Sequence, residues 1–292
     1  MVFTVAHARV LVTGGASGMG RLYAQRAVQE QAESVTLWDI DPLMLDATAS
    51  ALSGHGTIIH TRVVDVSRLE DVRAAAAHEL DEGRIPDVLI NNAGIVRGND
   101  YFWNTDSERD TEPTMRINAI APMHITREFL PAMITDAPRE KRILNVASAA
   151  GTLSNPRMSV YAASKWALIG WSDSVRLELE RSGNSHVRVT TFCPSYVATG
   201  MFEGVRGPLM TPILLPDIAV ARAWQAMLAG KPQRMTPWTV GLARALKGVL
   251  PPRAWDVVAD RVFHVYSSMD EFTGRADGGP TREQTREAEN RA

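Results

Sequence analysis

A serine, a tyrosine and a lysine within residues 148–165 form a group that is able to move a proton. Tyr161 and Lys165 are four residues apart, which places both side chains on one face of a helix, one turn apart. A free tyrosine has a pKa of about 10, and a neighbouring positive charge stabilises its anion. Ser148 comes at the end of a predicted strand, where its hydroxyl can hold a substrate oxygen. The alternative is an ordinary packed tyrosine beside a solvated lysine, because this spacing is common by chance.

A glycine-rich turn near the N-terminus indicates a phosphate-binding site. A short β-branched run, residues 10–13, leads into the sequence TGGASGMG, and an apolar-periodic helical stretch follows over residues 22–31. Glycines let the backbone approach a pyrophosphate, and the N–H groups of a helix N-terminus point at its charge. The spacing is G-x-x-x-G-x-G, and the alternative is a tight turn that only caps a helix.

The acidic residue that ends the second strand favours NAD as the cofactor. Residues 34–38 form this strand, and Asp39 follows at the position where a carboxylate binds the adenosine ribose hydroxyls and repels a 2′-phosphate. No basic residue follows at Ile40, although Arg21 lies close enough in sequence to keep NADP as the less favoured cofactor. Asp41 and Pro42 are predicted to cap and start the next helix.

Strand and helix patterns alternate six times, which predicts an α/β fold with a single doubly wound parallel sheet. The further strands are expected at residues 58–64, 88–90, 143–146 and 187–192, and the main helices at 67–81, 111–131 and 161–180. Ser67 and Glu70 read as a capping box for the first of these helices. Ligands of such sheets bind outside the carboxyl ends of the strands. The predicted strand ends carry small or polar residues at Gly14, Asp39, Asp65, Asn91, Ser148 and Pro194.

Composition excludes several other classes of protein. The 292 residues carry a formal charge of −2, which gives no electrostatic basis for binding nucleic acid. No uncharged apolar run approaches the roughly 18 residues of a membrane span, and the first residues do not read as a signal peptide. The single cysteine, Cys193, is expected to be a buried strand residue in a protein of a reducing compartment. We expect a cytoplasmic protein without a metal site.

Taken together, these motifs resemble the short-chain dehydrogenase/reductase family over about residues 9–201. The motifs are TGGASGMG, Asp39, Asp65-Val66, NNAG, Asn118, Ser148 and YAASK, in this order. The resemblance implies a Rossmann fold in which Tyr161 is the general acid/base and Ser148 orients the substrate oxygen. It further implies that Lys165 binds the nicotinamide ribose and lowers the pKa of Tyr161, and that Asn118 holds a relay water. The family's cofactor contacts would fall on Thr13, Gly14, Ser17, Gly18, Met19, Gly20, Asp39, Asp65, Val66, Asn92, Ala93, Gly94, Tyr161, Lys165, Pro194 and Thr199. Ser195 departs from the family's usual Pro-Gly. An equally favoured use of the two asparagines of NNAG is to tie adjacent loops together.

Several stretches are similar to the retinol dehydrogenase and hydroxysteroid dehydrogenase-like branch, among them TLWDID and CPSYVATGMFEG. Animal members of that branch act on lipophilic alcohols at membranes and carry an N-terminal hydrophobic anchor, which this sequence does not show. The resemblance implies an NAD-dependent oxidoreductase that interconverts a hydrophobic alcohol, of steroid, retinoid, terpene or aliphatic type, and its carbonyl. The alternatives are a carbonyl or 3-oxoacyl reductase and a non-catalytic NAD-sensing module.

The C-terminal third carries the variable parts of the molecule. The resemblance implies that residues 196–216 fold over the substrate, and the alternative is a loop with ordinary core anchors. Residues 216–229 are predicted to form a helix. Two basic amphipathic segments, 239–250 and 254–266, lie in a C-terminal helical extension over 237–274. These segments are expected to pack on the fold or a second subunit, with peripheral membrane contact as the alternative. We expect one domain over 1–274, a mobile tail over 275–292, and a homodimer or homotetramer.

Overall fold

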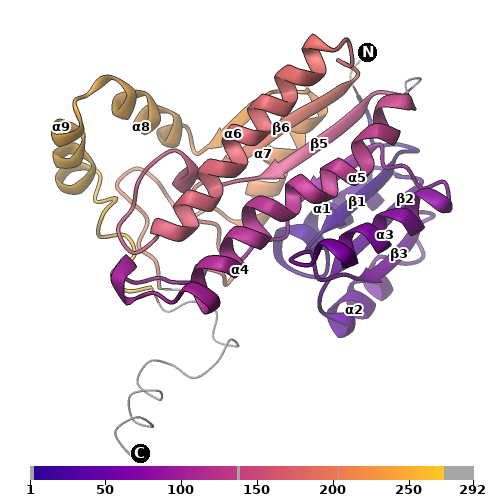
Figure 1. Ribbon diagram of the computed structural model, residues 1–292, viewed down its shortest axis with the longest axis horizontal. Helices are drawn as coiled ribbons and strands as arrows, with labels where there is room; N and C mark the ends of the chain where they lie inside the picture. The colour runs from indigo at the N-terminus through magenta and orange to yellow at the C-terminus, as the bar shows by residue number, and fades with distance from the viewer. Residues whose placement is uncertain (1–2, 137–138, 203, 273–292) are drawn as a thin grey trace, which may run out of the picture.

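The computed structural model describes residues 3–136, 139–202 and 204–272, and it is built around one parallel β-sheet (Figure 1). The seven strands of this part of the chain lie in the order β3-β2-β1-β4-β5-β6-β7, and all neighbours are parallel. The predicted doubly wound sheet in a single domain is therefore confirmed. The strands are β1 (Arg9–Thr13), β2 (Ser34–Asp39), β3 (Ile58–Val63), β4 (Val88–Asn91), β5 (Lys141–Val146), β6 (Val187–Pro194) and β7 (Gln233–Thr236).

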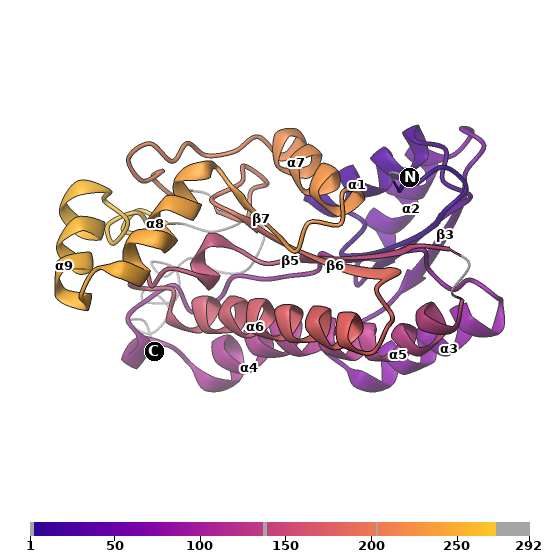
Figure 2. The ribbon, with the colours of Figure 1, turned by 90° about the horizontal axis from the view of Figure 1, so that it is seen from above.

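Helices cover both faces of the sheet, as the view from above shows (Figure 2). One face carries α1 (Gly18–Gln29), α2 (Pro42–Leu52) and α7 (Pro216–Leu228), and the other carries α3 (Leu69–Asp81), α5 (Ala121–Thr135) and α6 (Ser159–Arg181). Two further helices, α8 (Trp238–Val249) and α9 (Pro252–Val257), extend beyond the carboxyl end of β7.

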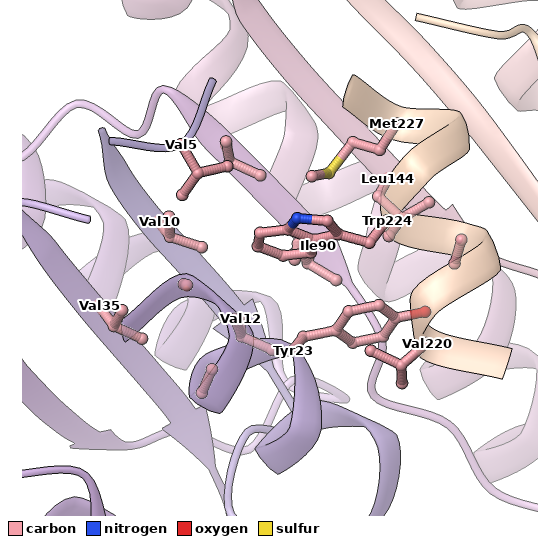
Figure 3. Close-up of a cluster of buried hydrophobic side chains, with 14 of the residues drawn as sticks. Val5, Val10, Val12, Tyr23, Val35, Ile90, Leu144, Val220, Trp224 and Met227 are labelled. Carbon is pink, nitrogen blue, oxygen red and sulfur yellow. The ribbon is translucent and has the colours of Figure 1, made fainter. Parts of the chain in front are cut away.

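The sheet has a hydrophobic cluster on each of its faces, because successive strand residues point to opposite faces. In β4, Val88 and Ile90 pack under α1 and α7, whereas Leu89 packs against the helices of the opposite face. Figure 3 shows the first of these clusters, in which Tyr23 of α1 and Trp224 of α7 stack at a centroid distance of 6.4 Å. This arrangement explains the continuous apolar runs of the strands.

The seventh strand is a difference from the expected six. Its sequence, QRMT, has one apolar residue and no alternating pattern, so hydrophobic periodicity does not reveal it. It forms because Pro194 and the three residues before it pair with β7 along the edge of the sheet. Backbone hydrogen bonds to β6, rather than the side chains of β7 itself, define this strand.

The capping box predicted at Ser67 and Glu70 is wrong. Helix α3 begins two residues later, and its N-cap residue, Arg68, makes no side-chain cap. Asp65 instead accepts hydrogen bonds from both the backbone N–H and the hydroxyl of Ser67, at 2.9 and 2.7 Å. Because the Ser67 hydroxyl is bound to Asp65 in this turn after β3, it does not cap the helix as expected. The cap predicted at Asp41 is confirmed, because its carboxylate accepts from the Met44 N–H.

The segment expected as one helix over 111–131 is longer and less regular. It starts with a π-turn at Ser107–Thr111, continues through α4 (Glu112–Met115) and a second π-turn at Arg116–Ile120, and runs on as α5 to Thr135. Pro122 explains the second interruption, since it has no N–H to donate to the carbonyl of Asn118 one turn earlier. The carbonyl of Asn118 is thereby released from the regular α-helical pattern.

The C-terminal extension packs on the fold, which matches the first of its predicted uses. Trp255 of α9 and Ala243 of α8 lie in one buried cluster with Leu153. The second amphipathic segment is shorter than expected, because α9 gives way to a π-turn at Val258–Val262. The predicted tail, 275–292, lies outside the described residues. Among the described helices, none is long and apolar enough to cross a membrane.

Candidate active site

A cleft of about 1270 Å³, counted with the space open to solvent, lies along the carboxyl ends of the strands. Its walls come from the turns that follow β1, β2, β4, β5 and β6, which explains why residues far apart in sequence meet there. Thirteen of the sixteen cofactor-binding candidates line it: Gly14, Ser17, Gly18, Met19, Asp39, Val66, Asn92, Ala93, Gly94, Tyr161, Lys165, Pro194 and Thr199.

The other three candidates lie behind the lining. Thr13 is fully buried, and its hydroxyl accepts the N–H groups of Asn92 and Ala93, each at 3.1 Å. Gly20 packs against the carbonyl of Gly14, where a Cβ would lie 1.9 Å from the oxygen. Asp65 uses one carboxylate oxygen in the turn with Ser67. These residues shape the turns of the cleft rather than its surface.

The glycine turn has the geometry of an anion cradle. Gly14 and Gly18 have φ values of +61° and +52°, which non-glycine residues rarely adopt. Ser17, the N-cap residue of α1, makes no side-chain cap, and the first turn of that helix holds no acidic residue. The N-terminus of α1 is therefore free of internal anions, and both Gly18 and Met19 line the cleft. These features fit the pyrophosphate of a dinucleotide.

The side chain of Asn92 holds the glycine turn in place. Its Nδ2 donates to the carbonyls of Thr13 and Gly14, at 3.0 and 3.1 Å. Asn91 instead points into the core and donates to Thr126 and Asn145. Both asparagines of the NNAG motif thus tie segments together, while Asn92 also lines the cleft.

Asp39 lies at the end of the cleft with its carboxylate held in place by the backbone. Oδ2 accepts the N–H of Ala16 at 2.9 Å, and Oδ1 accepts those of Ile40 and Asp41 at 2.8 and 3.2 Å. The next residue, Ile40, is exposed at 64% and also lines the cleft. A fixed negative charge beside an uncharged neighbour suits ribose hydroxyls and opposes a phosphate group.

The proton-transfer group lies where β5 ends and α6 begins. Tyr161, Ser148 and Lys165 all line the cleft and are all buried. Burial raises the pKa of Tyr161 to about 12, and a hydrogen bond with Ser148 opposes this rise. Removing the phenol from water disfavours its anion more than the hydrogen bond with Ser148 favours it, so the polypeptide alone does not lower the pKa of Tyr161 as expected. A bound, oxidised nicotinamide would supply further positive charge at this position.

Lys165 is held close to the tyrosine by the end of β5. Its Nζ donates to the carbonyl of Val146 at 3.0 Å and lies 5.8 Å from the centre of the Tyr161 ring. Burial lowers the pKa of Lys165 to about 8. A lysine with this pKa is mostly charged at neutral pH and has one direct hydrogen bond in the described structure, which leaves donors for a cofactor ribose.

Asn118 is fully buried and ties the reaction centre to its surroundings. Its Oδ1 accepts the N–H of Ile95 at 2.9 Å, while its Nδ2 donates to the Ile95 carbonyl at 2.8 Å and to Ser164 at 3.2 Å. Both amide hydrogens are used in this way, and the backbone carbonyl, to which Pro122 cannot donate, is a further acceptor near the predicted relay water. The role of Asn118 stays a prediction.

A second, apolar pocket of about 710 Å³ adjoins the cleft. Ser148, Ser195 and Phe202 line both spaces, so the pocket opens next to the proton-transfer group. Residues 196–216, predicted as the substrate loop, contribute Tyr196, Phe202, Pro208 and Thr211. No residue of the C-terminal extension was predicted to line the substrate site. The pocket is nevertheless also lined by residues of α8 and of the segment after α9: Thr239, Val240, Ala243, Phe263 and Val265.

Ser195, which stands where the resembled family has glycine, has a buried hydroxyl without a hydrogen-bond partner among the described residues. Its backbone N–H donates to the carbonyl of Thr236 at 2.8 Å, so the strand pair β6 and β7 fixes its position. An unpaired buried hydroxyl in the wall between the two spaces is what a site built for a bound cofactor and substrate would contain. Together with the glycine turn, it makes the cleft suited to a nicotinamide dinucleotide.

Comparison with known proteins places this architecture in a defined class. The family model of the short chain dehydrogenases matches residues 8–208, and the chain belongs to this family. It is thus an oxidoreductase of a nicotinamide-dependent family whose members act on CH–OH groups.

Two curated relatives show where within the family the chain falls. Estradiol 17-beta-dehydrogenase 11 of Pongo abelii is 34% identical over 253 residues, covering 87% of this chain and 82% of the relative. Epidermal retinol dehydrogenase 2 of Mus musculus is 33% identical over 276 residues, covering 93% of this chain and 87% of the relative. The predicted resemblance to the retinol and hydroxysteroid dehydrogenase branch is confirmed.

Solved structures confirm the fold at lower sequence identity. A short chain dehydrogenase/reductase from Burkholderia phymatum in complex with NAD has a TM-score of 0.75 at 23% identity and covers 84% of this chain and 94% of its own. Another from Burkholderia cenocepacia, in complex with NADP, has a TM-score of 0.73 at 22% identity and covers 89% and 99%. The two neighbours differ in cofactor, so the choice between NAD and NADP depends on the residues of this chain.

Proposed function

We propose that the protein is an NAD-dependent oxidoreductase that interconverts a hydrophobic alcohol and its carbonyl. One observation carries this proposal: Tyr161 and Ser148 lie at the junction of a dinucleotide-sized cleft and an apolar pocket. An alcohol bound in the pocket would place its carbinol carbon beside the nicotinamide end of the cleft. The apolar lining, with Leu153, Met158 and Val240, suits a lipophilic skeleton of the steroid, retinoid, terpene or aliphatic type.

In the oxidation direction, the Tyr161 phenolate accepts the hydroxyl proton while the hydride leaves the carbinol carbon. Ser148 holds the substrate oxygen, and its backbone position is fixed because its hydroxyl also accepts the Ala150 N–H at 3.1 Å. NAD⁺ supplies the hydride acceptor. Lys165 binds the ribose and balances the charge of the phenolate, and the main-chain carbonyl of Asn118 holds the water through which the proton leaves.

The proposal of NAD over NADP is supported by Asp39. The carboxylate accepts from three backbone donors that hold it in place, and no cation contacts it in the described structure. A 2′-phosphate at this end of the cleft would face that negative charge.

The variant Tyr161→Phe tests the mechanism. We expect alcohol-dependent NADH formation, followed at 340 nm, to fall by about 10³-fold, within the range of general acid–base catalysis. NADH binding by fluorescence titration should change little, because the ring of Tyr161 stays in place. Full turnover in this variant would contradict the proposed role.

The reverse reaction, as a carbonyl reductase, is a second candidate that a specific observation favours. Burial raises the pKa of Tyr161 to about 12, so the free protein holds a protonated phenol, ready to act as an acid. Rates in both directions, measured at equal cofactor concentrations over one panel of alcohol and carbonyl pairs, separate the two. A non-catalytic NAD sensor would bind NADH yet show no turnover with any member of the panel.

We further propose a homodimer or homotetramer that uses the outer face of α6. Trp166 and Leu177 on this helix are each exposed at 47%, and Ile120 before α5 at 39%. Light scattering coupled to gel filtration tests this assembly. Peripheral membrane contact through the exposed Trp238 and Val249 of α8 is a separate possibility, and liposome flotation tests it.

A further inference from the structure

The short segment that follows Ser148 lies between helix α6 and the C-terminal extension. It begins with a 3₁₀ turn at Ala149–Gly151, of which Ser148 is the N-cap residue. The Ser148 hydroxyl accepts the N–H of Ala150, so the orientation of this hydroxyl depends on where the turn lies. We refer to residues 149–155 as the serine turn.

Gly151 brings the serine turn into close contact with α6. A Cβ on this residue would lie 2.7 Å from the carbonyl oxygen of Lys165 and 2.6 Å from Cδ1 of Ile169. The glycine therefore lets the turn approach the backbone of the helix that carries Tyr161 and Lys165. This contact limits how near the turn comes to α6, and a further contact is needed to hold it there.

The extension packs on the serine turn through an apolar contact. Leu153 lies in one buried cluster with Ala243 of α8 and Trp255 of α9. Apolar burial is non-directional, so this cluster brings α8 to the serine turn without defining the orientation of the turn.

Lys247 of α8 supplies a directional contact. Its Nζ lies 4.7 Å from the centre of the Trp166 ring on α6. The same Nζ donates to the carbonyl of Thr152 and to the hydroxyl of Ser154, each at 3.4 Å. A cation–π contact and two hydrogen bonds each require a defined position of the ammonium group. One side chain thus joins α8, α6 and the serine turn.

The position of Lys247 in the chain separates it from the site already described. The family model matches residues 8–208, and Lys247 lies beyond them. Among the described residues, it is also not part of the lining of the cleft or of the apolar pocket. Any effect of Lys247 on the reaction therefore acts through the residues that it contacts.

We propose that Lys247 is a positioning residue for the reaction. By holding the serine turn against α6, it keeps the Ser148 hydroxyl within reach of Tyr161 and of the substrate oxygen. This inference rests on the proposed function, because it assumes that Ser148 binds the oxygen of an alcohol. The competing role is structural: Lys247 would only attach the extension to the fold.

The variant Lys247→Met tests the proposal with two alcohols of different size, cyclohexanol and cyclododecanol. Methionine keeps an apolar stem and removes the charge and the donors. We expect kcat/KM to fall by about tenfold for both alcohols, since a misplacement of about 1 Å can cost a hundredfold in rate. The loss should be equal because each alcohol has one hydroxyl at Ser148, however far it fills the pocket. The Kd for NADH should stay unchanged.

The variant Lys247→Arg should recover kcat/KM to within about twofold, because a guanidinium keeps the charge, donates hydrogen bonds and stacks on an aromatic ring. Arg244→Met is the matched control, since it removes another cation of α8 whose side chain donates to Gln233 and not to the serine turn. Lys247→Ala is the second variant if Lys247→Met does not fold by circular dichroism.

Three results would overturn the proposal. An unchanged kcat/KM together with a lower free energy of unfolding, from urea denaturation, would leave the structural role. A loss confined to cyclododecanol would mean that the shape of the pocket has changed instead. A loss that accompanies a change in subunit number, followed by light scattering, would mean that the contact with Trp166 acts on assembly.

A binding measurement separates this inference from the proposed function. If no alcohol is oxidised, the binding of cyclohexanol and cyclododecanol to the NADH-loaded protein is measured by calorimetry. A Kd that rises by the same factor for both alcohols in Lys247→Met, and recovers in Lys247→Arg, supports the positioning role even though the proposed reaction has then failed. Unchanged Kd values overturn it.

Discussion

The two halves of the active site are constructed from different parts of the chain and in different ways. The cofactor half is made by short turns at the ends of β1, β2 and β4, where glycines and backbone hydrogen bonds set the shape. The substrate half is made by apolar side chains from the loop after β6, from α8 and from the segment after α9. Phe202 and the two serines, Ser148 and Ser195, are where the halves meet.

This difference determines how each half responds to change. A turn shaped by its backbone has little room for an added atom, so a small substitution should weaken cofactor binding strongly. A pocket lined by side chains of several segments has adjustable volume, so a substitution should change which ligand fits and leave the cofactor bound.

The variant Gly20→Ala should break the cofactor half. A Cβ at this position would lie 1.9 Å from the carbonyl oxygen of Gly14 and 2.7 Å from Asn92 Nδ2, so the turn must move. We expect the Kd for NADH, from fluorescence titration, to rise by about a hundredfold, equivalent to roughly 3 kcal/mol. Gly170→Ala is the control, because a Cβ on this glycine of α6 meets nothing within 4 Å. An unchanged Kd in Gly20→Ala would show that the turn is not the pyrophosphate site.

The variant Ala243→Leu should change the substrate half alone. Ala243 lines the apolar pocket from α8, and a larger side chain there reduces its volume. We expect KM for the bulkiest alcohols of the panel to rise by about tenfold, with the Kd for NADH unchanged. Ala254→Leu makes the same substitution on the exposed surface of α9 and should leave both constants alone. A parallel rise in the Kd for NADH would mean that the two halves are not independent.

The same contrast explains how much the sequence reveals. The glycine turn, Asp39 and the strand ends are local patterns, in which each residue type follows from the backbone conformation at its own position. Thirteen of the predicted cofactor-binding residues therefore line the cleft. The cap predicted at Ser67 is wrong because the Ser67 hydroxyl donates to Asp65 in the turn before the helix, and the spacing of the residues does not reveal this local contact.

The substrate half depends on tertiary contacts that have no local pattern. Val240, Phe263 and Val265 read as residues of amphipathic segments, and only the packing of α8 and α9 beyond β7 directs them into the pocket. The strand β7, which precedes α8, is itself recognisable only from its pairing with β6. The contacts of Asn155 with Tyr196 and Ser268 also have no local pattern, since the two hydroxyls come from distant segments of the chain.

The variant Asp39→Asn tests the electrostatic part of the cofactor half. An amide at this position keeps one of the two oxygens that accept from the backbone, loses the other, and removes the charge that opposes a 2′-phosphate. We expect the preference for NADH over NADPH, taken as the ratio of their Kd values, to fall by about tenfold. Asp41→Asn is the control, because Asp41 caps α2 and is not part of the cleft lining. A ratio that does not move in Asp39→Asn would remove the basis for NAD selection.

Lys165, which lies near the point where the cofactor half and the substrate half meet, should reduce the stability of the folded protein. Burial lowers its pKa from 10.5 to about 8, so the charged form is held at a cost of about 3 kcal/mol. Lys165→Met removes that cost and leaves the carbonyl of Val146 without its donor. We expect a net gain in the free energy of unfolding of about 1–2 kcal/mol at pH 7, measured by urea denaturation, together with a loss of turnover.

The pH dependence distinguishes this cause from simple repacking. Between about pH 8 and 10.5 the unfolded chain binds more protons at Lys165 than the folded chain, so the stability of the wild type rises with pH over this window. The advantage of Lys165→Met should therefore be largest below pH 8 and shrink toward pH 10.5. Lys231→Met, a substitution of an exposed lysine, is the control and should show no such trend. An advantage that stays constant between pH 7 and 10 would mean that better packing, and not relief of a buried charge, stabilises the variant.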